Sequence, residues 1–157
     1  MGVKQMISEN EELLGLWNAA VEAVGGRRVV RRYLEQCPDK FTYVIAVGKA
    51  AGAMIQGAYD VANDEIEQSL LITKYGHVDA HLHHVESLRI IESGHPIPDE
   101  QSLRAGRELV AFIRSVPRSE NLLFLISGGA SSLVEVLPNE LSLKQWQAIS
   151  EDLIASG

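Results

Sequence analysis

The sequence predicts an α/β fold in which helices flank a mostly parallel sheet. Helix-like and strand-like segments alternate along its 157 residues, as they do where helical crossovers join parallel strands. Short apolar runs of four or five residues have the length and composition of strands in such a sheet. Each run leads into a polar loop that contains glycine, and ligands of open parallel sheets bind beyond such strand ends.

The composition is typical of one globular domain and excludes several classes of protein. Hydrophobic residues make up 46% and charged residues 22% of the chain, which suffices for a packed core. The formal net charge of −7 provides no general attraction to nucleic acid or anionic lipid, so neither is an expected partner. Cys37 is the only cysteine, which excludes an internal disulfide and a thiolate metal cluster, and a reducing compartment fits.

The amino-terminal residues carry no targeting signal that we can identify. They lack an apolar segment of the kind found in signal peptides. Met6 stands where N-myristoylation after Gly2 requires Ser or Thr. No apolar run approaches the roughly 18 residues of a membrane-spanning helix. We therefore expect a cytoplasmic protein with no membrane partner.

Two helices are expected before the first strand. Ser8 and Glu11 form a capping-box pattern, after which apolar residues recur at helical spacing until Gly25. A second helix is expected over 29–36. The one basic run of the sequence lies here and comprises Arg27, Arg28, Arg31 and Arg32. An exposed helix face is favoured as its explanation over a phosphate-binding patch.

Four strands are expected, and their positions follow from the apolar runs. The first covers 43–47 and is followed by a helix of small residues that ends near Asp60. The second covers 69–73. The third, over 88–91, alternates more between apolar and polar residues and is therefore expected nearer an edge of the sheet. The fourth, over 122–126, is the clearest of the set.

Capping patterns place the later helices. Asp99 or Ser102 can cap a helix between the third and fourth strands. Ser142 and Gln145 form a capping box for a last helix that runs to about Ala155. A domain that ends one helix after its fourth strand leaves a sheet edge uncovered unless something else pairs with it. This pattern favours the interpretation that the chain is a fragment.

The loop after the fourth strand is the best candidate for binding an anion. It comprises Ser127, Gly128, Gly129, Ala130, Ser131 and Ser132. The glycines let backbone N–H groups approach an anion, the hydroxyls can donate hydrogen bonds, and the following helix N-terminus adds partial positive charge. The alternative is a tight strand-to-helix turn with capping serines. The loop matches neither a Walker A motif nor G-x-G-x-x-G, and no G-x-S-x-G elbow supports a hydrolase.

Cationic side chains follow the other strands. Lys49 lies between two small residues, so its ammonium can face a transferred phosphate; the alternative is a surface lysine that opens a helix. Lys74 has the same two interpretations, with Tyr75 as a stacking or hydroxyl partner. His95 is held between a glycine and a proline, where contact with substrate and a role in the turn are both reasonable.

Four more histidines crowd into the segment after the second strand. They are His77, His81, His83 and His84, with Asp79 among them. A solvated polar loop is favoured over a metal site, because the segment lacks i, i+4 ligands on a helix and a frame of carboxylates. We therefore assign no metal ligand to the sequence.

Four ordered blocks resemble the class II glycerate kinases. These are the glycerate 2-kinases of the MOFRL-associated family, some of which carry the older label of hydroxypyruvate reductase. The blocks are Ala46-Val47-Gly48-Lys49-Ala50-Ala51, Thr73-Lys74-Tyr75-Gly76-His77, Glu92-Ser93-Gly94-His95-Pro96-Ile97-Pro98-Asp99-Glu100 and Leu125-Ile126-Ser127-Gly128-Gly129-Ala130-Ser131. Their order and spacing also agree with the family, and the resemblance runs from the first helix to the last residue.

The resemblance implies ATP-dependent phosphorylation of glycerate to 2-phosphoglycerate, with Mg²⁺. Family enzymes have two domains, and the active site lies between a large N-terminal domain with a Rossmann-like sheet and a C-terminal domain. Residues 1–157 would form an incomplete part of that N-terminal domain, without the C-terminal MOFRL domain. Lys49 matches the family's catalytic lysine, whereas its key Asp and Arg lie beyond Gly157. The isolated chain is therefore not expected to be active without the missing part.

Two other functions remain open at this stage. The chain could be a non-catalytic module that binds an anion or nucleotide. An oxidoreductase, as the older label suggests, is disfavoured because the sequence lacks G-x-G-x-x-G and the acidic residue expected about 20 residues later. The sequence does not decide whether the loop over 127–132 holds ATP phosphate or glycerate carboxylate. Lys74 and His95 are expected as secondary contacts.

Overall fold

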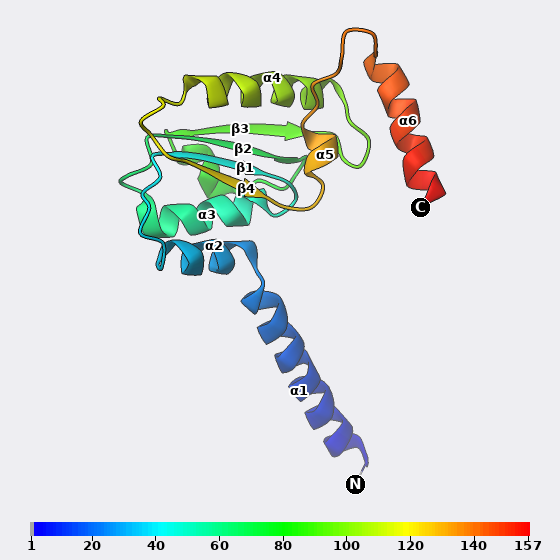
Figure 1. The fold of residues 1–157 in the computed structure, drawn as a ribbon. Helices are drawn as coiled ribbons and strands as arrows, with labels where there is room; N and C mark the ends of the chain where they lie inside the picture. The colour runs from blue at the N-terminus through cyan, green and yellow to red at the C-terminus, as the bar shows by residue number, and fades with distance from the viewer. Residues whose placement is uncertain (1) are drawn as a thin grey trace.

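The computed structural model describes residues 2–157, and the side chains of residues 10–157. Its centre is one four-stranded sheet with the order β3-β2-β1-β4, in which all neighbouring strands are parallel. The strands are β1 (Tyr43–Val47), β2 (Gln68–Lys74), β3 (Leu88–Ser93) and β4 (Leu122–Ile126). The predicted α/β class, a parallel sheet with flanking helices, is confirmed (Figure 1).

Helices cover both faces of the sheet and extend from both ends of the chain (Figure 1). They are α1 (Gly2–Ala23), α2 (Gly26–Leu34), α3 (Ala51–Ala62), the 3-10 helix η1 (Ala80–His84), α4 (Glu100–Ser115), α5 (Ala130–Leu133) and α6 (Leu143–Ser156). Figure 1 shows α4 on one side of the sheet and α3 and α2 on the other. α1 and α6 point away from the sheet and expose large apolar side chains, such as Trp17 and Leu153. Within residues 2–157, no helix combines the length and the apolar character that crossing a bilayer requires.

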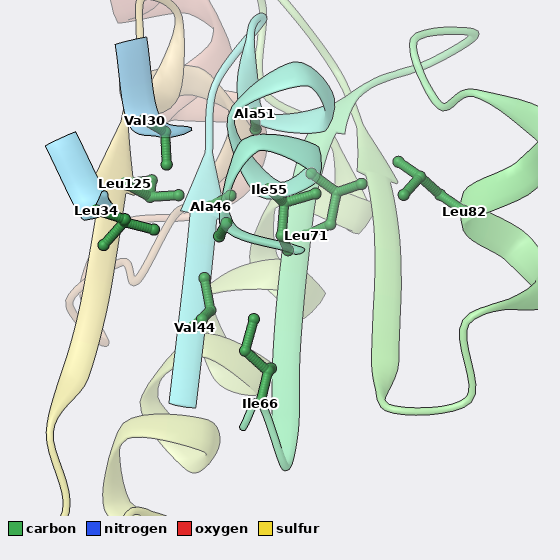
Figure 2. Close-up of a cluster of buried hydrophobic side chains, with 11 residues drawn as sticks. Val30, Leu34, Val44, Ala46, Ala51, Ile55, Ile66, Leu71, Leu82 and Leu125 are labelled. Atoms are coloured by element: carbon green, nitrogen blue, oxygen red, sulfur yellow. The ribbon is translucent and has the colours of Figure 1, made fainter. Parts of the chain in front are cut away.

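Two apolar cores, one on each face of the sheet, share the residues of β1. Val44 and Ala46 belong to the core under α2 and α3, which Figure 2 shows. Tyr43, Ile45 and Val47 belong to the core under α4 and α5. This alternation follows from the pleat of a strand, whose successive side chains point to opposite faces. Because both faces are covered, all five residues are buried, which explains the uninterrupted apolar run.

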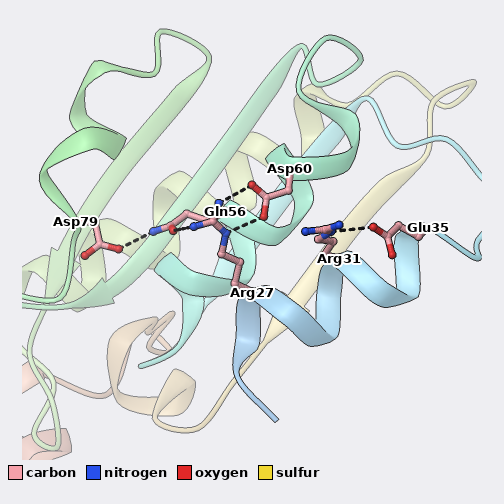
Figure 3. A network of polar contacts seen from close by, with 6 residues as sticks. All are labelled: Arg27, Arg31, Glu35, Gln56, Asp60 and Asp79. Carbon is pink, nitrogen blue, oxygen red and sulfur yellow. Dashed lines mark hydrogen bonds and ion pairs between the residues drawn. The ribbon is translucent and has the colours of Figure 1, made fainter. Parts of the chain in front are cut away.

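Arg27, the first arginine of the run, holds α2 against α3 (Figure 3). Arg27 Nε and Nη2 donate to the two carboxylate oxygens of Asp60, each at 2.7 Å. Arg27 Nη1 also donates to Gln56 Oε1 at 3.4 Å, and Gln56 Nε2 donates to Asp79 Oδ2 at 2.5 Å. At Gly57, a Cβ atom would overlap the Arg27 carbonyl, so the two helix backbones approach closely.

Carboxylates accompany two other arginines of the run, Arg28 and Arg31, as well. Arg31 Nε lies 2.8 Å from Glu35 Oε1, and Arg28 Nη1 lies 3.6 Å from Glu22 Oε1. The hollow that the four arginines line, with a volume of about 970 Å³, also contains the acidic groups of Glu22, Glu35 and Asp60. An exposed helix face, held by ion pairs, therefore accounts for the run better than a phosphate-binding patch.

The capping patterns of the sequence are confirmed at two of three helices. Asp99 caps α4 with Ser102 in a reciprocal capping box, and Ser142 caps α6 with Gln145 in the same way. The prediction that Ser8 begins the first helix is wrong, because α1 begins at Gly2. Lys4, Gln5 and Met6, which precede Ser8, have high helix propensity and favour a helix that extends through the local capping pattern.

The two edges of the sheet are β3 and β4. β3 was expected near an edge from its alternation, and its position confirms this expectation. β4 pairs only with β1 among the described residues, and its Phe124 and Ile126 are 40% and 60% exposed. The uncovered edge anticipated from the sequence is therefore present in this structure at β4.

Candidate functional site

The carboxyl ends of all four strands meet at one edge of the sheet. Val47 of β1 lies opposite Ile72 of β2 and Ile126 of β4, and Lys74 of β2 lies opposite Ser93 of β3. The loops that carry the candidate residues start directly after these positions. The parallel register thus gathers segments from 48 to 132 on one side of the molecule, where α/β proteins bind ligands.

Gly48 makes the sharp turn at the end of β1. Its φ angle of 121° is disfavoured for residues with a side chain, and a Cβ atom would overlap the Ser127 side chain and backbone. The Gly48 N–H donates to the Ile72 carbonyl at 3.1 Å. The buried Thr73 hydroxyl donates to the Gly48 carbonyl at 2.9 Å. Sequence reasoning missed this supporting role of Thr73, because no local pattern predicts a bond across 25 residues.

The loops after β1 and β4 are bonded side by side. The Lys49 N–H donates to the Gly128 carbonyl at 2.9 Å, and the Ala50 N–H donates to Ser127 Oγ at 3.0 Å. The Ser127 N–H donates in turn to the Val47 carbonyl at 2.9 Å. These bonds fix Lys49 beside the glycine turn of the other loop.

Lys49 and His95 meet at the turn formed by Gly128 and Gly129. A Cβ atom on Gly129 would lie 2.7 Å from His95 Nε2 and 3.3 Å from Lys49 Cγ, and the φ angle of this residue is 89°. A Cβ atom on Gly128 would lie 3.7 Å from Lys49 Cε. The absence of a side chain at Gly129 therefore lets three strand-end loops converge.

Lys49 and Lys74 bring two positive charges to this region, and no ion pair among residues 10–157 neutralises either of them. Burial lowers the pKa of His95 below its usual value, and the nearby ammonium groups of Lys49 and Lys74 lower it further. Both lysines therefore lie close enough to act on this imidazole. Within residues 10–157, neither lysine forms an ion pair with a carboxylate. An anionic ligand would supply the missing negative charge.

The carboxylates of this edge already accept hydrogen bonds from neutral donors. Asp99 Oδ2 accepts from the Tyr75 hydroxyl at 2.7 Å, and Asp99 Oδ1 accepts from the N–H groups of Gly94 and Ser102 at 3.1 and 3.0 Å. Burial of Asp99 opposes ionisation, but these hydrogen bonds outweigh it and leave the pKa of the carboxyl lowered. The bond to Asp99 raises the pKa of Tyr75 to about 12, with smaller contributions from burial and the acidic charges of Asp99 and Glu92.

Glu92 holds the same loop from the end of β3. Its Oε1 atom accepts from the Gly76 N–H at 2.6 Å and from the His77 N–H at 3.4 Å. The segment that follows Lys74 is therefore bonded to two carboxylates of the neighbouring strand and loop. Sequence reasoning identified Asp99 only as a helix cap and gave Glu92 no role.

The serines of the predicted anion loop have different environments. The Ser127 hydroxyl accepts from Ala50 and donates to the Val47 carbonyl at 3.4 Å, and the buried Ser132 hydroxyl donates to the Gly129 carbonyl at 3.3 Å. Ser131 is exposed. α5 is only four residues long, so its dipole adds less positive charge than the sequence suggested. Positive charge near the loop comes chiefly from Lys49 and Lys74.

The histidine-rich segment forms the 3-10 helix η1. Leu82 is buried under it, whereas His81, His83 and His84 are exposed. Among the residues that the structure describes, no group of three His, Cys, Asp or Glu side chains is arranged to hold a metal ion. The arrangement is that of a surface segment anchored by one apolar side chain.

These features define an α/β domain whose strand-end loops bring together cationic side chains and glycine turns. Residues 12–157 match the profile of a family described as "Domain of unknown function (DUF4147)". The match covers nearly the whole sequence, and the chain belongs to this family.

Similar proteins support the resemblance that the four blocks indicated. The D-glycerate 2-kinase of Thermotoga maritima is 34% identical over 138 residues, which cover 88% of this chain and 32% of that protein. A protein of Agrobacterium vitis with the provisional name hydroxypyruvate reductase is 30% identical over 152 residues, with coverages of 96% and 34%. The crystal structure of Thermotoga maritima glycerate kinase matches with a TM-score of 0.83 at 32% identity and covers 96% of this chain and 36% of that one. The chain thus spans about a third of the length of these relatives.

Proposed function

We propose that the chain provides the anion-binding part of a glycerate 2-kinase active site, in which ATP phosphorylates glycerate to 2-phosphoglycerate. One observation carries this proposal: Lys49 lies across the Gly128–Gly129 turn, next to His95, with no carboxylate paired to its ammonium among residues 10–157. The similarity to the glycerate kinase of Thermotoga maritima, in sequence and in fold, supports the assignment of substrate.

The geometry suits the demands of phosphoryl transfer. In the proposed reaction, the glycerate C2 hydroxyl oxygen bonds to the γ-phosphorus of ATP, the bond to the β,γ-bridging oxygen breaks, and ADP and the hydroxyl proton leave. Catalysis of such a step depends mainly on positioning and on neutralising charge. We assign the neutralising role to the Lys49 ammonium, and we assign contacts with the phosphate or carboxylate to Lys74, His95 and the loop over 127–132.

The Mg²⁺ ion implied by the resemblance does not find a matching ligand set in the described part of this chain. The two carboxylates nearest the site, Asp99 and Glu92, are engaged by N–H and O–H donors, and no cluster of three acidic or histidine ligands occurs in residues 10–157. Mg²⁺ is commonly bound through substrate phosphates and only one or two carboxylates. No step of the proposal therefore depends on a metal ligand of this chain.

Two alternative functions differ from the kinase in what they require. A module that binds the anion without transferring a phosphoryl group needs only the strand-end site. A hydroxypyruvate reductase needs a dinucleotide site, and the loop after β1 lacks the G-x-G-x-x-G pattern that such sites use. The absence of this pattern makes the reductase the weaker alternative.

A chimeric enzyme tests the proposed function. Residues 1–157 replace the matching third of the Thermotoga maritima glycerate kinase, and the formation of 2-phosphoglycerate from glycerate and ATP is measured. We expect turnover in the chimera, a decrease of about 10²-fold or more with Lys49→Ala, and near-normal turnover with Lys40→Ala at the opposite end of the sheet. Normal turnover with Lys49→Ala would refute the role of this lysine. Phosphate or ATP binding by the isolated chain, with an inactive but folded chimera, would favour the binding module.

A further inference from the structure

Asp99 connects two loops of the anion site in addition to capping α4. Its side chain accepts hydrogen bonds from Ser102 at the start of α4, from the Gly94 N–H after β3 and from the Tyr75 hydroxyl after β2. A helix cap alone requires only the bond to Ser102. The bonds to Gly94 and Tyr75 therefore fix the positions of the two loops relative to each other.

The two loops that Asp99 joins carry the two secondary cationic groups of the site. Tyr75 directly follows Lys74, and Gly94 directly precedes His95. At Gly94, a Cβ atom would lie 2.6 Å from the Ile97 carbonyl oxygen and 3.0 Å from Asp99 Cγ, so the loop is folded tightly around the carboxylate. The Ser93 hydroxyl, which is fully buried, donates to the Leu133 carbonyl at 2.8 Å and fixes the start of this loop. The His95 loop is thus held by several hydrogen bonds. Tyr75 fastens the Lys74 loop to it, in addition to the bonds that Glu92 of β3 accepts from Gly76 and His77.

We propose that Tyr75 and Asp99 are positioning residues, whose hydrogen bond sets the separation between Lys74 and His95 and thereby the anion affinity of the site. The proposal rests on the proposed function in one respect, namely that an anion binds between these groups. Neither residue needs to touch the ligand. The 2.7 Å bond joins loops of two adjacent strands at the edge where the ligand is expected.

The molecule contains a matched control for this bond at the other end of the same two strands. The Tyr59 hydroxyl contacts Ser69 Oγ of β2 at 2.5 Å and Ser87 Oγ, just before β3, at 3.3 Å. Tyr59→Phe and Tyr75→Phe therefore each remove one tyrosine hydroxyl that bridges β2 and β3, one at the amino end and one at the carboxyl end of the strands. Tyr75 is 52% exposed, so its substitution leaves the core intact.

The test uses the 157-residue chain and two readouts. NMR titration of the His95 imidazole reports its pKa, and titration with inorganic phosphate and with ATP reports anion affinity. We expect Tyr75→Phe to weaken anion binding by about three- to tenfold, as the loss of one hydrogen bond predicts. Because Lys74 would then lie farther from His95, the pKa of His95 should rise toward its usual value. Tyr59→Phe should change neither readout.

A second variant separates positioning from simple electrostatics. Asp99→Ser keeps a residue that can cap α4 but removes a negative charge near the anion, and its single hydroxyl cannot replace both carboxylate oxygens. Electrostatics alone predicts tighter binding in this variant, whereas loss of positioning predicts weaker binding. Tighter or unchanged binding with Asp99→Ser, or equal effects of Tyr75→Phe and Tyr59→Phe, would overturn the proposal. If the unmodified chain binds no anion, the proposed function fails for this chain, and the pKa of His95 in the two tyrosine variants still decides the positioning role.

Discussion

The two ends of the parallel sheet differ in how their charges are arranged. At the amino end, three glutamates lie close together around the entries of the strands. Lys40 pairs with Glu65, the Thr42 hydroxyl donates to Glu120 at 2.5 Å, and the Tyr43 hydroxyl donates to Glu67 at 3.1 Å. The single lysine here already has a carboxylate partner.

The carboxyl end has the opposite arrangement. Lys49 and Lys74 have no carboxylate partner within residues 10–157, and the acids of this end, Asp99 and Glu92, accept from neutral donors. The two ends also differ in their backbone, because all four strands present their carboxyl ends at this edge only. The comparison teaches that the placement of lysines and acids agrees with the end of the sheet at which this architecture binds ligands.

The largest expected effect concerns the turn that holds the carboxyl end together. Gly48→Ala should lower the free energy of unfolding by about 3 kcal/mol or more, because it combines an unfavourable φ angle with overlap against Ser127. Gly76→Ala should cost only about 1 kcal/mol, because Gly76 also has a positive φ, 72°, but a Cβ atom there would meet no other atom within 4 Å. Urea denaturation of both variants provides the measurement. Similar losses of unfolding free energy in the two variants would mean that the contact between the β1 and β4 loops contributes little to stability.

A smaller effect is expected from the threonines at the two ends. Thr73→Val leaves the Gly48 carbonyl without its buried hydroxyl partner and should cost about 1–2 kcal/mol in the free energy of unfolding. Thr42→Val removes a hydroxyl that bonds the exposed Glu120, and should cost about 0.5 kcal/mol or less. If urea denaturation gave equal losses of unfolding free energy for Thr73→Val and Thr42→Val, the bond from Thr73 to Gly48 would not stabilise the site more than an exposed hydrogen bond does.

The smallest expected effect is a dependence of stability on pH. The pKa of His95 is lowered in the folded protein, so its contribution to stability is fully present above the ordinary value of 6.5 and is lost as the pH falls toward the lower, folded-state pKa. His95→Gln should therefore lose less stability than the unmodified chain between pH 7 and pH 5, about the range in which histidine titrates. His83→Gln, at an exposed position, serves as the control for loss of a histidine. A pH dependence that is unchanged by His95→Gln would contradict the burial of this ring beside the two lysines.

Local sequence signals predicted much of this fold. The strands over 43–47 and 122–126 have the predicted bounds, and the capping boxes at Asp99 and Ser142 are confirmed. These features depend on residues within a few positions of one another, which is the range that periodicity and capping report. The same locality explains the failure at Ser8, where a capping pattern occurs inside a longer helix.

The candidate site depends on contacts that no local pattern contains. The sequence predicted that Lys49, His95 and the glycine loop lie at strand ends, and the structure brings them together. It did not predict that Ser127 would bond Ala50 across 77 residues, or that Tyr75 would bond Asp99 across 24. Such bonds follow from the strand order β3-β2-β1-β4 and its register, which are properties of tertiary packing. The catalytic role of Lys49, the cofactors ATP and Mg²⁺, and the cytoplasmic location stay predictions.

The most direct test of this account is to measure ATP binding to the 157-residue chain by calorimetry, with one lysine removed from each end of the sheet. Lys49→Gln and Lys40→Gln remove the same charge from the carboxyl and amino ends, and Lys40 is the lysine that already has a carboxylate partner. The account predicts that Lys49→Gln weakens ATP binding by about tenfold or more, whereas Lys40→Gln leaves it unchanged. Equal weakening by the two substitutions, or an undiminished affinity in Lys49→Gln, would contradict an anion site at the carboxyl end.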